Sequence, residues 1–403
     1  MADIRIDGSE RVTLSDIRSL SERAKVVSDR IREGMLAPSQ VKIAPTFSSA
    51  QLAALLDLAP HQIDYWLKKG GLPGGTNATG TRRLFTLSDV RTWARRFRTD
   101  RMRPQDAEGI VMSIANYKGG VAKTTTAFTL AQGLAARGHK VLFIDVDPQG
   151  SATSLFGLRP DDIKPHNTLL PLCVGEESSI EYAISPTYWD GIDLVPAAGF
   201  LFGAEFALPG RQRSEGAGFK FWNVFHYGLE IARQNYDAII MDTSPALSYL
   251  TINSILASDG IIMPLPPNGL DFASSVQFWD LFVDLTEEFE TRGLEKSFDF
   301  VNILLSKVDT TDIATNVVRE WISAAYGSRV LPIEIPKTST AASSSAAFGS
   351  IYDMRPGSAS SRTIKRAIDA YDQFVTTIES QMVSAWRRQT STSSVTTLNS
   401  EAA

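Results

Sequence analysis

The chain has 403 residues, of which 43% are hydrophobic and 21% are charged, a composition typical of a globular protein with two or three domains. The single cysteine excludes a disulfide framework, and the absence of an N-terminal apolar core or a run of about 18 apolar residues argues against secretion and membrane spanning. The net charge of −5 conceals an asymmetry. Residues 1–108 carry 18 basic and 13 acidic side chains (+5), and the remainder carries 22 and 32 (−10). Because the basic excess concentrates between Lys68 and Arg103, we expect nucleic acid to bind there.

The first expected element, in residues 1–45, is an amphipathic helix from about Leu14 to Met35. Thr13 and Asp16 have the spacing of a capping box. Apolar residues recur at three- and four-residue steps and share one face, namely Leu14, Ile17, Leu20, Ala24, Val27, Ile31 and Met35. A lone helix of this length is marginal in water. We therefore expect the stripe to pack on this chain's own body or on a second copy.

Residues 46–98 have the order helix, turn, helix, glycine-rich hairpin and helix. A short helix over 49–56 and a turn at 57–60 precede a second helix, His61–Lys69, and a hairpin strand, Thr81–Phe85, leads to the last helix. This order resembles the MerR-type winged helix-turn-helix domain, which implies that the second helix enters the major groove and that the wing touches phosphates. The candidate DNA-binding residues are Gln62, Lys68, Lys69, Arg82 and Arg83. The alternative is a small helical domain with a solvated basic face. A polar linker, 99–108, follows.

A glycine-rich loop lies between the apolar segment Ile110–Ala115 and a helix-compatible run at 127–132, and residues 117–126 read Tyr-Lys-Gly-Gly-Val-Ala-Lys-Thr-Thr-Thr. A strand, a glycine turn with Lys-Thr and a helix are the layout of a phosphate-binding loop. Lys123 is then expected on the β- and γ-phosphate oxygens, and the Thr124 hydroxyl on Mg²⁺. The expected nucleotide-binding residues here are Lys118, Gly119, Gly120, Val121, Ala122, Lys123, Thr124 and Thr125. The alternative is a glycine-rich turn without a ligand.

Lys118 is the sharper feature, because an ordinary phosphate-binding loop needs only Lys123. A lysine directly before the Gly-Gly pair lies near the loop's opening, where it can reach a partner's nucleotide across a dimer interface. The run Lys-Gly-Gly-Val-x-Lys-Thr-Thr resembles the deviant Walker A motif of the ParA/MinD family of ATPases. Tyr117 and Ala122 stand where the general pattern has glycine. The Ala122 methyl lies where the backbone bends tightly toward phosphate, which predicts slower turnover or weaker binding.

The rest of the chain, 109–388, alternates apolar and amphipathic segments. The apolar runs, which we interpret as buried parallel strands, are Val141–Ile144, Ile192–Val195, Ala238–Met241, Ile261–Met263, Val301–Leu305 and Val330–Ile335. The predicted fold class is α/β, a P-loop ATPase domain with a mostly parallel sheet that binds phosphate at the carboxyl ends of its strands. The Ser/Thr-rich segment 389–403 is expected to be a disordered tail.

Three carboxylates are expected at that edge of the sheet. Asp145 and Asp147 end a strand and, by alternation, point to the same side, and Asp242 ends the run 236–242. The segments resemble the Asp-x-Asp-Pro-Gln first switch and the Walker B or second-switch segment of the family. By that likeness Asp147 activates the attacking water, while Asp145 and Asp242 support Mg²⁺ with Thr124, partly through water. The alternative for the first pair is an acidic turn at a strand end.

Later segments also resemble landmarks of the ParA family. Ser306 lies in one of them, and Pro336 and Lys337 resemble the segment that lines the adenine and a DNA-contacting residue. The arginine that the family often carries after the strand ending near Asp309 is missing. Four basic residues near the C-terminus are candidates to compensate for it or to form a solvated face, namely Lys365, Arg366, Arg387 and Arg388.

The whole chain resembles the large ParA partition ATPases: an N-terminal dimerisation helix, a winged helix-turn-helix and a deviant Walker ATPase. The resemblance implies a cytoplasmic, nucleoid-associated homodimer that uses ATP/ADP and Mg²⁺, binds nucleoid DNA without sequence preference, and answers to a ParB-type partner. The winged domain would bind and repress the partition operator. Two alternatives stay open: a MinD-like positioning ATPase, and an ATP/ADP-liganded repressor without significant turnover.

Overall fold

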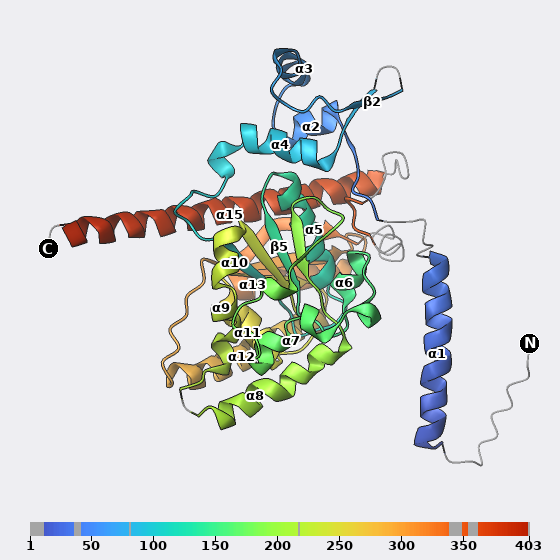
Figure 1. The fold of residues 1–403 in the computed structure, drawn as a ribbon, viewed down its shortest axis with the longest axis vertical. Helices are drawn as coiled ribbons and strands as arrows, with labels where there is room; N and C mark the ends of the chain where they lie inside the picture. Colours follow the sequence, from blue (N-terminus) through green and yellow to red (C-terminus); the bar gives the residue numbers. More distant parts are fainter. Residues whose placement is uncertain are drawn as a thin grey trace, which may run out of the picture. The chain divides into compact units, whose positions relative to one another are not determined.

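The computed structural model describes residues 12–35, 42–79, 82–216, 218–337, 349–353 and 362–401. The chain divides into two compact units, 1–42 and 43–403. The first contains α1, Leu14–Met35 (Figure 1). Its predicted capping box is present, since the Thr13 amide donates to Asp16 Oδ2 (2.8 Å) and the Asp16 amide to Thr13 Oγ1 (3.3 Å). Within this unit Leu14, Ile17 and Leu20 are each at least half exposed. The surface that covers the stripe stays a prediction.

The winged helix-turn-helix is the first part of the second unit. Its elements are β1 (Phe47–Ser48), α2 (Ser49–Leu55), α3 (Pro60–Lys69), β2 (Thr76–Thr79), β3 (Arg82–Phe85) and α4 (Leu87–Phe97), and its sheet has the order β1-β3-β2. Ile63, Phe85 and Trp93 form a small core that is fully buried. The predicted helix order and hairpin are therefore confirmed. The turn between the helices is made by Asp57, a non-glycine residue with φ of +54°.

The main sheet has eight strands in the order β11-β10-β9-β4-β8-β5-β7-β6. All neighbours are parallel except the antiparallel edge pair β6–β7. The strands are β4 (Ile110–Ile114), β5 (Val141–Asp145), β6 (Ser185–Pro186), β7 (Ile192–Val195), β8 (Ala238–Asp242), β9 (Gly260–Leu265), β10 (Phe300–Val308) and β11 (Val330–Pro336). All the predicted parallel strands are present, and only the two-residue β6 was not predicted.

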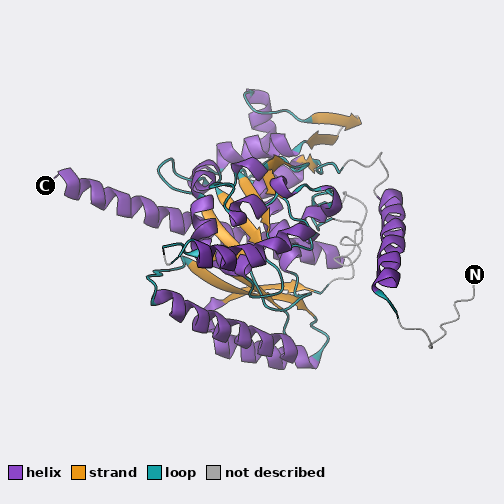
Figure 2. Cartoon of the chain, turned by 60° about the horizontal axis from the view of Figure 1, so that its bottom comes forward, coloured by secondary structure: helices purple, strands orange, loops and turns teal. Residues whose placement is uncertain are grey.

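Helices cover both faces of this sheet (Figure 2). The remaining helices are α5 (Lys123–Ala136), α6 (Ser151–Leu155), α7 (Leu170–Val174), α8 (Ala204–Ser214), α9 (Val224–Gly228), α10 (Glu230–Asn235), α11 (Tyr249–Ala257), α12 (Gly269–Glu290), α13 (Ile313–Tyr326) and α15 (Arg362–Glu401). Side-chain alternation splits the strands between two cores. Val111 and Ile239 pack with α7–α13, whereas Met112 and Ile240 pack with α5 and α15.

The C-terminal helix differs from the expectation of a disordered tail after 389, because α15 continues to Glu401. Hydroxyl groups there bond within the helix, as when Ser391 Oγ donates to the Arg387 carbonyl (2.7 Å). Trp386 Nε1 donates to the Glu108 carbonyl (2.9 Å) and the Gln389 Oε1 accepts from the Glu108 amide (2.9 Å). These two bonds fix the helix to the residues just before β4.

The segment 99–108, expected to be a polar linker, is also held against the α/β domain that follows it. It begins with a 3₁₀ turn, Thr99–Arg101. The Arg103 guanidinium donates to Asp237 Oδ1 (3.0 Å) and to the Gln234 carbonyl (2.9 Å). The winged helix-turn-helix and the α/β domain accordingly form one compact unit.

Candidate functional site: a phosphate loop beside buried carboxylates

The phosphate-binding loop runs from the end of β4 to the start of α5. Gly120 and Ala122 have φ of +77° and +76°, so the chain makes two left-handed steps before Lys123 begins the helix. The Lys123 ammonium, 7% exposed, donates back to the Lys118 carbonyl (2.9 Å). Burial lowers the pKa of Lys123, while the charges of Asp242 and Asp147 act to raise it. The loop thus curls around a buried cation, the arrangement that a phosphate group requires.

Ala122 is the one strained position in this loop. A non-glycine residue at this φ places Cβ against its own backbone, which costs roughly 1 kcal/mol. The methyl departs from the glycine of the general pattern as the sequence indicated, but it leaves the amide in place as a donor.

Asp242 is the most unusual group at the sheet edge. It is fully buried, and neither carboxylate oxygen has a hydrogen-bond partner in the described part of the chain. Burial raises its pKa well above the ordinary range and the charge of Asp145 adds to this, while the nearby Thr124 hydroxyl and Lys123 lower it. Asp242 and Asp145 are register partners on adjacent strands, so the predicted convergence of these carboxylates is present.

Burying an ionised carboxylate without a partner costs free energy, unless a cation or a water bound to that cation contacts it. Asp242 beside Thr124 therefore fits Mg²⁺, which commonly binds through one or two protein oxygens, waters and substrate phosphates. Among the described residues, the sheet edge included, no group of three or more His, Cys, Asp or Glu side chains forms a complete metal-ligand set of its own. The donor set thus suits a metal ion that arrives with a nucleotide.

Asp145 has different surroundings from those expected of a metal ligand. Its Oδ2 accepts from the Thr153 amide and hydroxyl (both 2.7 Å), and its Oδ1 from the Asp147 amide (3.2 Å). Burial raises its pKa to about 7 despite the Thr153 hydrogen bonds. Both oxygens are already engaged, so these contacts favour a role in holding α6 and the Asp147 segment in place. Asp147 itself is half-buried and accepts from the Gln149 amide (3.0 Å).

Lys118 is held within its own chain in this structure. Its ammonium lies 2.5 Å from Asp271 Oδ1, in the first turn of α12, and its side chain is 37% exposed. Its amide donates to the Asn116 Oδ1 (3.0 Å), and Asn116 Nδ2 in turn donates to the Pro264 carbonyl (2.8 Å). Asn116 was not predicted as a site residue, although a polar residue directly after a buried strand is a usable signal.

Two residues near the end of β10 hydrogen-bond to carbonyls of the phosphate-binding loop. Ser306 Oγ donates to the Val121 carbonyl (2.9 Å), which places this predicted residue against the loop. Lys307, which sequence analysis did not single out as a site residue, has φ of +51° and donates to the Gly120 carbonyl (2.6 Å). Pro336 ends β11, and the exposed Lys337 pairs with Asp309 (3.3 Å).

The candidate DNA-binding residues divide into two that hydrogen-bond within the winged region and two lysines at the end of α3. Gln62 Oε1 caps α3 by accepting from the Ala59 amide (2.8 Å), and Arg83 NH1 donates to the Gly74 carbonyl (2.5 Å) inside the hairpin. Lys68 is exposed, and Lys69 lies over the Trp66 ring. The side chain of Arg82 lies outside the described residues.

The basic excess that predicted nucleic-acid binding is largely used inside the molecule. Five arginines bond to the ATPase domain or to α15, namely Arg91, Arg95, Arg98, Arg101 and Arg103. Those five arginines therefore have partners within the chain, and nucleic-acid binding between 68 and 103 stays a prediction. Because these arginines are already engaged, the exposed face of α3 and the wing are the surfaces that we still expect to contact DNA.

Comparison with known proteins agrees with both parts of the fold. Residues 47–95 match the MerR HTH family of regulatory proteins, and residues 109–293 match an AAA domain family. Protein SopA of Escherichia coli (strain K12) is 31% identical over 309 residues, which cover 75% of this chain and 79% of that protein. The chromosome partitioning protein ParA of Caulobacter vibrioides is 30% identical over 250 residues, 61% of this chain and 88% of that protein.

Two solved structures are similar as well. A partition protein aligns over 90% of this chain and 99% of its own with a TM-score of 0.58, and at 20% identity it shows the shared fold. The cobyrinic acid a,c-diamide synthase of Mycobacterium smegmatis, solved with ADP and magnesium, covers 66% of this chain and 93% of its own, with 25% identity and a TM-score of 0.51. The fold and the site define a P-loop nucleotide-binding protein joined to a winged helix-turn-helix. The chain belongs to the ParA family of partition ATPases.

Proposed function

We propose that this chain hydrolyses ATP to drive the partition of a plasmid or secondary chromosome. The observation that carries the proposal is the fully buried, unpartnered Asp242 carboxylate beside the Lys123 loop. In a metal-nucleotide complex, the metal ion would neutralise the buried Asp242 carboxylate. The phosphates of the same complex would occupy the space that the loop surrounds. The similar synthase solved with ADP and magnesium supports the same ligand pair.

The residues would share the work as follows. Amides of the Gly119–Thr125 loop and the Lys123 ammonium bind the β- and γ-phosphates. Thr124 and Asp242 would hold Mg²⁺, which neutralises charge on the phosphates when bound. Asp147 orients the attacking water, and Asp145 keeps the Asp147 segment in place through its bonds to Thr153.

Lys118 would act on the nucleotide of a second copy. In the present structure it pairs with Asp271, so a dimer that uses it must first exchange that contact for a phosphate. We propose that ATP favours this dimer, that the dimer binds nucleoid DNA without sequence preference, and that a ParB-type protein stimulates hydrolysis and release. The protein would then be cytoplasmic and associated with the nucleoid.

The winged helix-turn-helix would bind the partition operator and repress it. The exposed residues of α3 include His61, Asp64, Tyr65 and Lys68, which helical spacing places on one face. A helix face of this kind reads base edges in the major groove, while a lysine at its end neutralises a phosphate. The Arg82 wing position would add a further phosphate contact.

Measured turnover and DNA binding test this proposal. Purified protein should hydrolyse ATP, retain random-sequence DNA only with ATP, and protect DNA upstream of its own gene in a footprint. Lys68→Ala should weaken the footprint and lower its salt slope by about 1, while Lys164→Ala, at an exposed lysine to which no DNA contact is assigned, serves as the control. Absence of hydrolysis would favour the ligand-controlled repressor.

A positioning ATPase that works on membranes is the other alternative. Among the described helices, none has the length and apolarity needed to cross a membrane. Co-sedimentation with anionic lipid vesicles in ATP, run beside the random-DNA assay, separates the two functions, because a partition protein should follow the DNA.

A further inference from the structure

Two arginines of α4 and the arginine that caps its C-terminus reach the C-terminal end of α5. The last carbonyls of a helix have no partner inside it and attract cations. The bonds are Arg91 Nε to the Ala135 carbonyl (3.2 Å), Arg95 Nε to the Gly138 carbonyl (2.8 Å) and Arg98 NH1 to the Arg137 carbonyl (3.3 Å). We call these three residues the arginine clamp. The winged region thus hydrogen-bonds to the C-terminal end of α5, the helix whose N-terminus begins in the phosphate loop.

The helix between loop and clamp is short and tightly enclosed. α5 has 14 residues, about 20 Å at 1.5 Å per residue, and residues 126–136 are buried throughout. A Cβ added at Gly133 would lie 2.6 Å from Val375 Cγ2 of α15, and one at Gly138 would lie 3.3 Å from Ala94 Cβ of α4. Interiors packed this closely do not absorb a displacement locally. A shift of α5 therefore has to move its neighbours.

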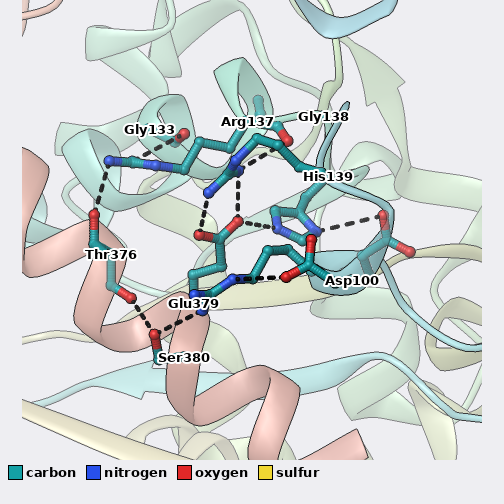
Figure 3. A network of polar contacts seen from close by, with 12 residues as sticks. Asp100, Gly133, Arg137, Gly138, His139, Thr376, Glu379 and Ser380 are labelled. Atoms are coloured by element: carbon teal, nitrogen blue, oxygen red, sulfur yellow. Dashed lines mark hydrogen bonds and ion pairs between the residues drawn. The ribbon is translucent and has the colours of Figure 1, made fainter. Parts of the chain in front are cut away.

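A buried carboxylate joins the clamp to the C-terminal helix (Figure 3). Glu379 of α15 is fully buried and accepts from both terminal nitrogens of Arg98 (2.8 and 2.7 Å). The same carboxylate lies 2.8 Å from His139 Nε2, directly after α5. Arg101 NH1 donates to the Ser380 Oγ (3.0 Å). Since separating a buried ion pair leaves a charge uncompensated, α4, the end of α5 and α15 should move together.

We propose that α5 and the arginine clamp transmit the nucleotide state of the phosphate loop to the winged helix-turn-helix. When a nucleotide binds, the Lys123 ammonium exchanges the Lys118 carbonyl for phosphate, and the first turn of α5 adjusts. The clamp passes the adjustment to α4, and α3 changes its presentation to DNA. This inference rests on the proposed function, because it takes the loop as the nucleotide site and the winged region as the DNA reader.

Hydrogen exchange on the full chain, with and without ADP, tests the connection without requiring a known operator. Arg95→Ala removes the bond to Gly138 from an exposed position, so the fold should survive. Arg96→Ala is the matched control, because Arg96 is exposed on the same helix and its side chain makes no hydrogen bond or ion pair with the described part of the chain. ADP should change amide exchange at both α5 and α4 in the wild type and in the control.

In Arg95→Ala, ADP affinity by calorimetry should stay within about twofold of wild type, the α5 response should persist, and the α4 response should fall by at least half. An α4 that ignores ADP in the wild type, or an Arg95→Ala response equal to that of the control, overturns the inference. Failure to bind ADP at all overturns the proposed nucleotide site, and this inference with it. Normal ADP binding with a silent α4 overturns only the transmission.

Discussion

Replacing Glu379 with glutamine should cost the protein about 3 kcal/mol of stability at neutral pH. Burial by itself would raise the pKa of this carboxyl, but hydrogen bonds and charge from His139 and Arg98 lower it from 4.5 to about 2. At 1.36 kcal/mol per pKa unit, this shift of about 2.5 corresponds to roughly 3 kcal/mol. The value agrees with the roughly 3–5 kcal/mol that removing one partner of a buried ion pair costs.

The pH dependence follows from the sign of this shift. A folded-state pKa below the unfolded value stabilises the protein at pH above about 4.5, and the stabilisation is lost as pH falls toward about 2. Urea unfolding of wild type and Glu379→Gln at pH 7 and at pH 3 measures the difference. Glu320→Gln, an exposed position on α13, is the control and should change stability by less than about 0.5 kcal/mol. A cost under about 1 kcal/mol at pH 7, or an equal cost at both pH values, would refute the reasoning.

Three further substitutions probe the nucleotide site. Lys123→Ala removes the buried ammonium from the loop and should weaken ATP binding about 100-fold, as a lost charge-assisted hydrogen bond does. Titration with a fluorescent ATP analogue checks this, and unchanged affinity would exclude Lys123 from the site. Lys118→Ala should spare ADP binding but reduce hydrolysis and the ATP-dependent dimer, which turnover assays and sedimentation measure. Wild-type turnover would rule out action on a partner's nucleotide. Asp147→Ala should keep ATP binding, lose water activation and prolong random-DNA retention in ATP, whereas loss of nucleotide binding would make Asp147 structural.

The sheet and the site edge could be predicted because their signals are local. An apolar run marks each parallel strand in the sequence. The carboxylates Asp145 and Asp242 each end such a run, and in the fold they are register partners on adjacent strands. The contacts of Lys118 could not be predicted, since Asp271 lies 153 positions later and only the fold brings them together. The Thr153 contact of Asp145 could not be predicted for a related reason: a strand-end carboxylate looks the same in the sequence whether it supports a metal ion or accepts from the amide of Thr153.

Charge composition does not separate the roles of the arginines in the winged region. An arginine that binds a DNA phosphate and one that binds a helix C-terminus or a buried glutamate are equivalent in a count of charges. Arg98 shows this, because its partner Glu379 lies 281 positions away. Hydroxyl-rich composition is equally ambiguous near the C-terminus, where the Ser391 hydroxyl donates to the Arg387 carbonyl of its own helix.

The docked arrangement of α4 bears on how such a protein can be recombined. A DNA reader on a free tether can be exchanged for another as an independent module. Here two arginines of the winged region form ion pairs with other parts of the chain. Arg98 pairs with Glu379 near the C-terminus, and Arg91 pairs with Asp190 in the α/β domain (2.8 Å). A chimera that imports a winged region from a relative would need matching partners at both positions. Exchange of the winged helix-turn-helix in this chain is therefore tied to its α/β domain and its C-terminal helix.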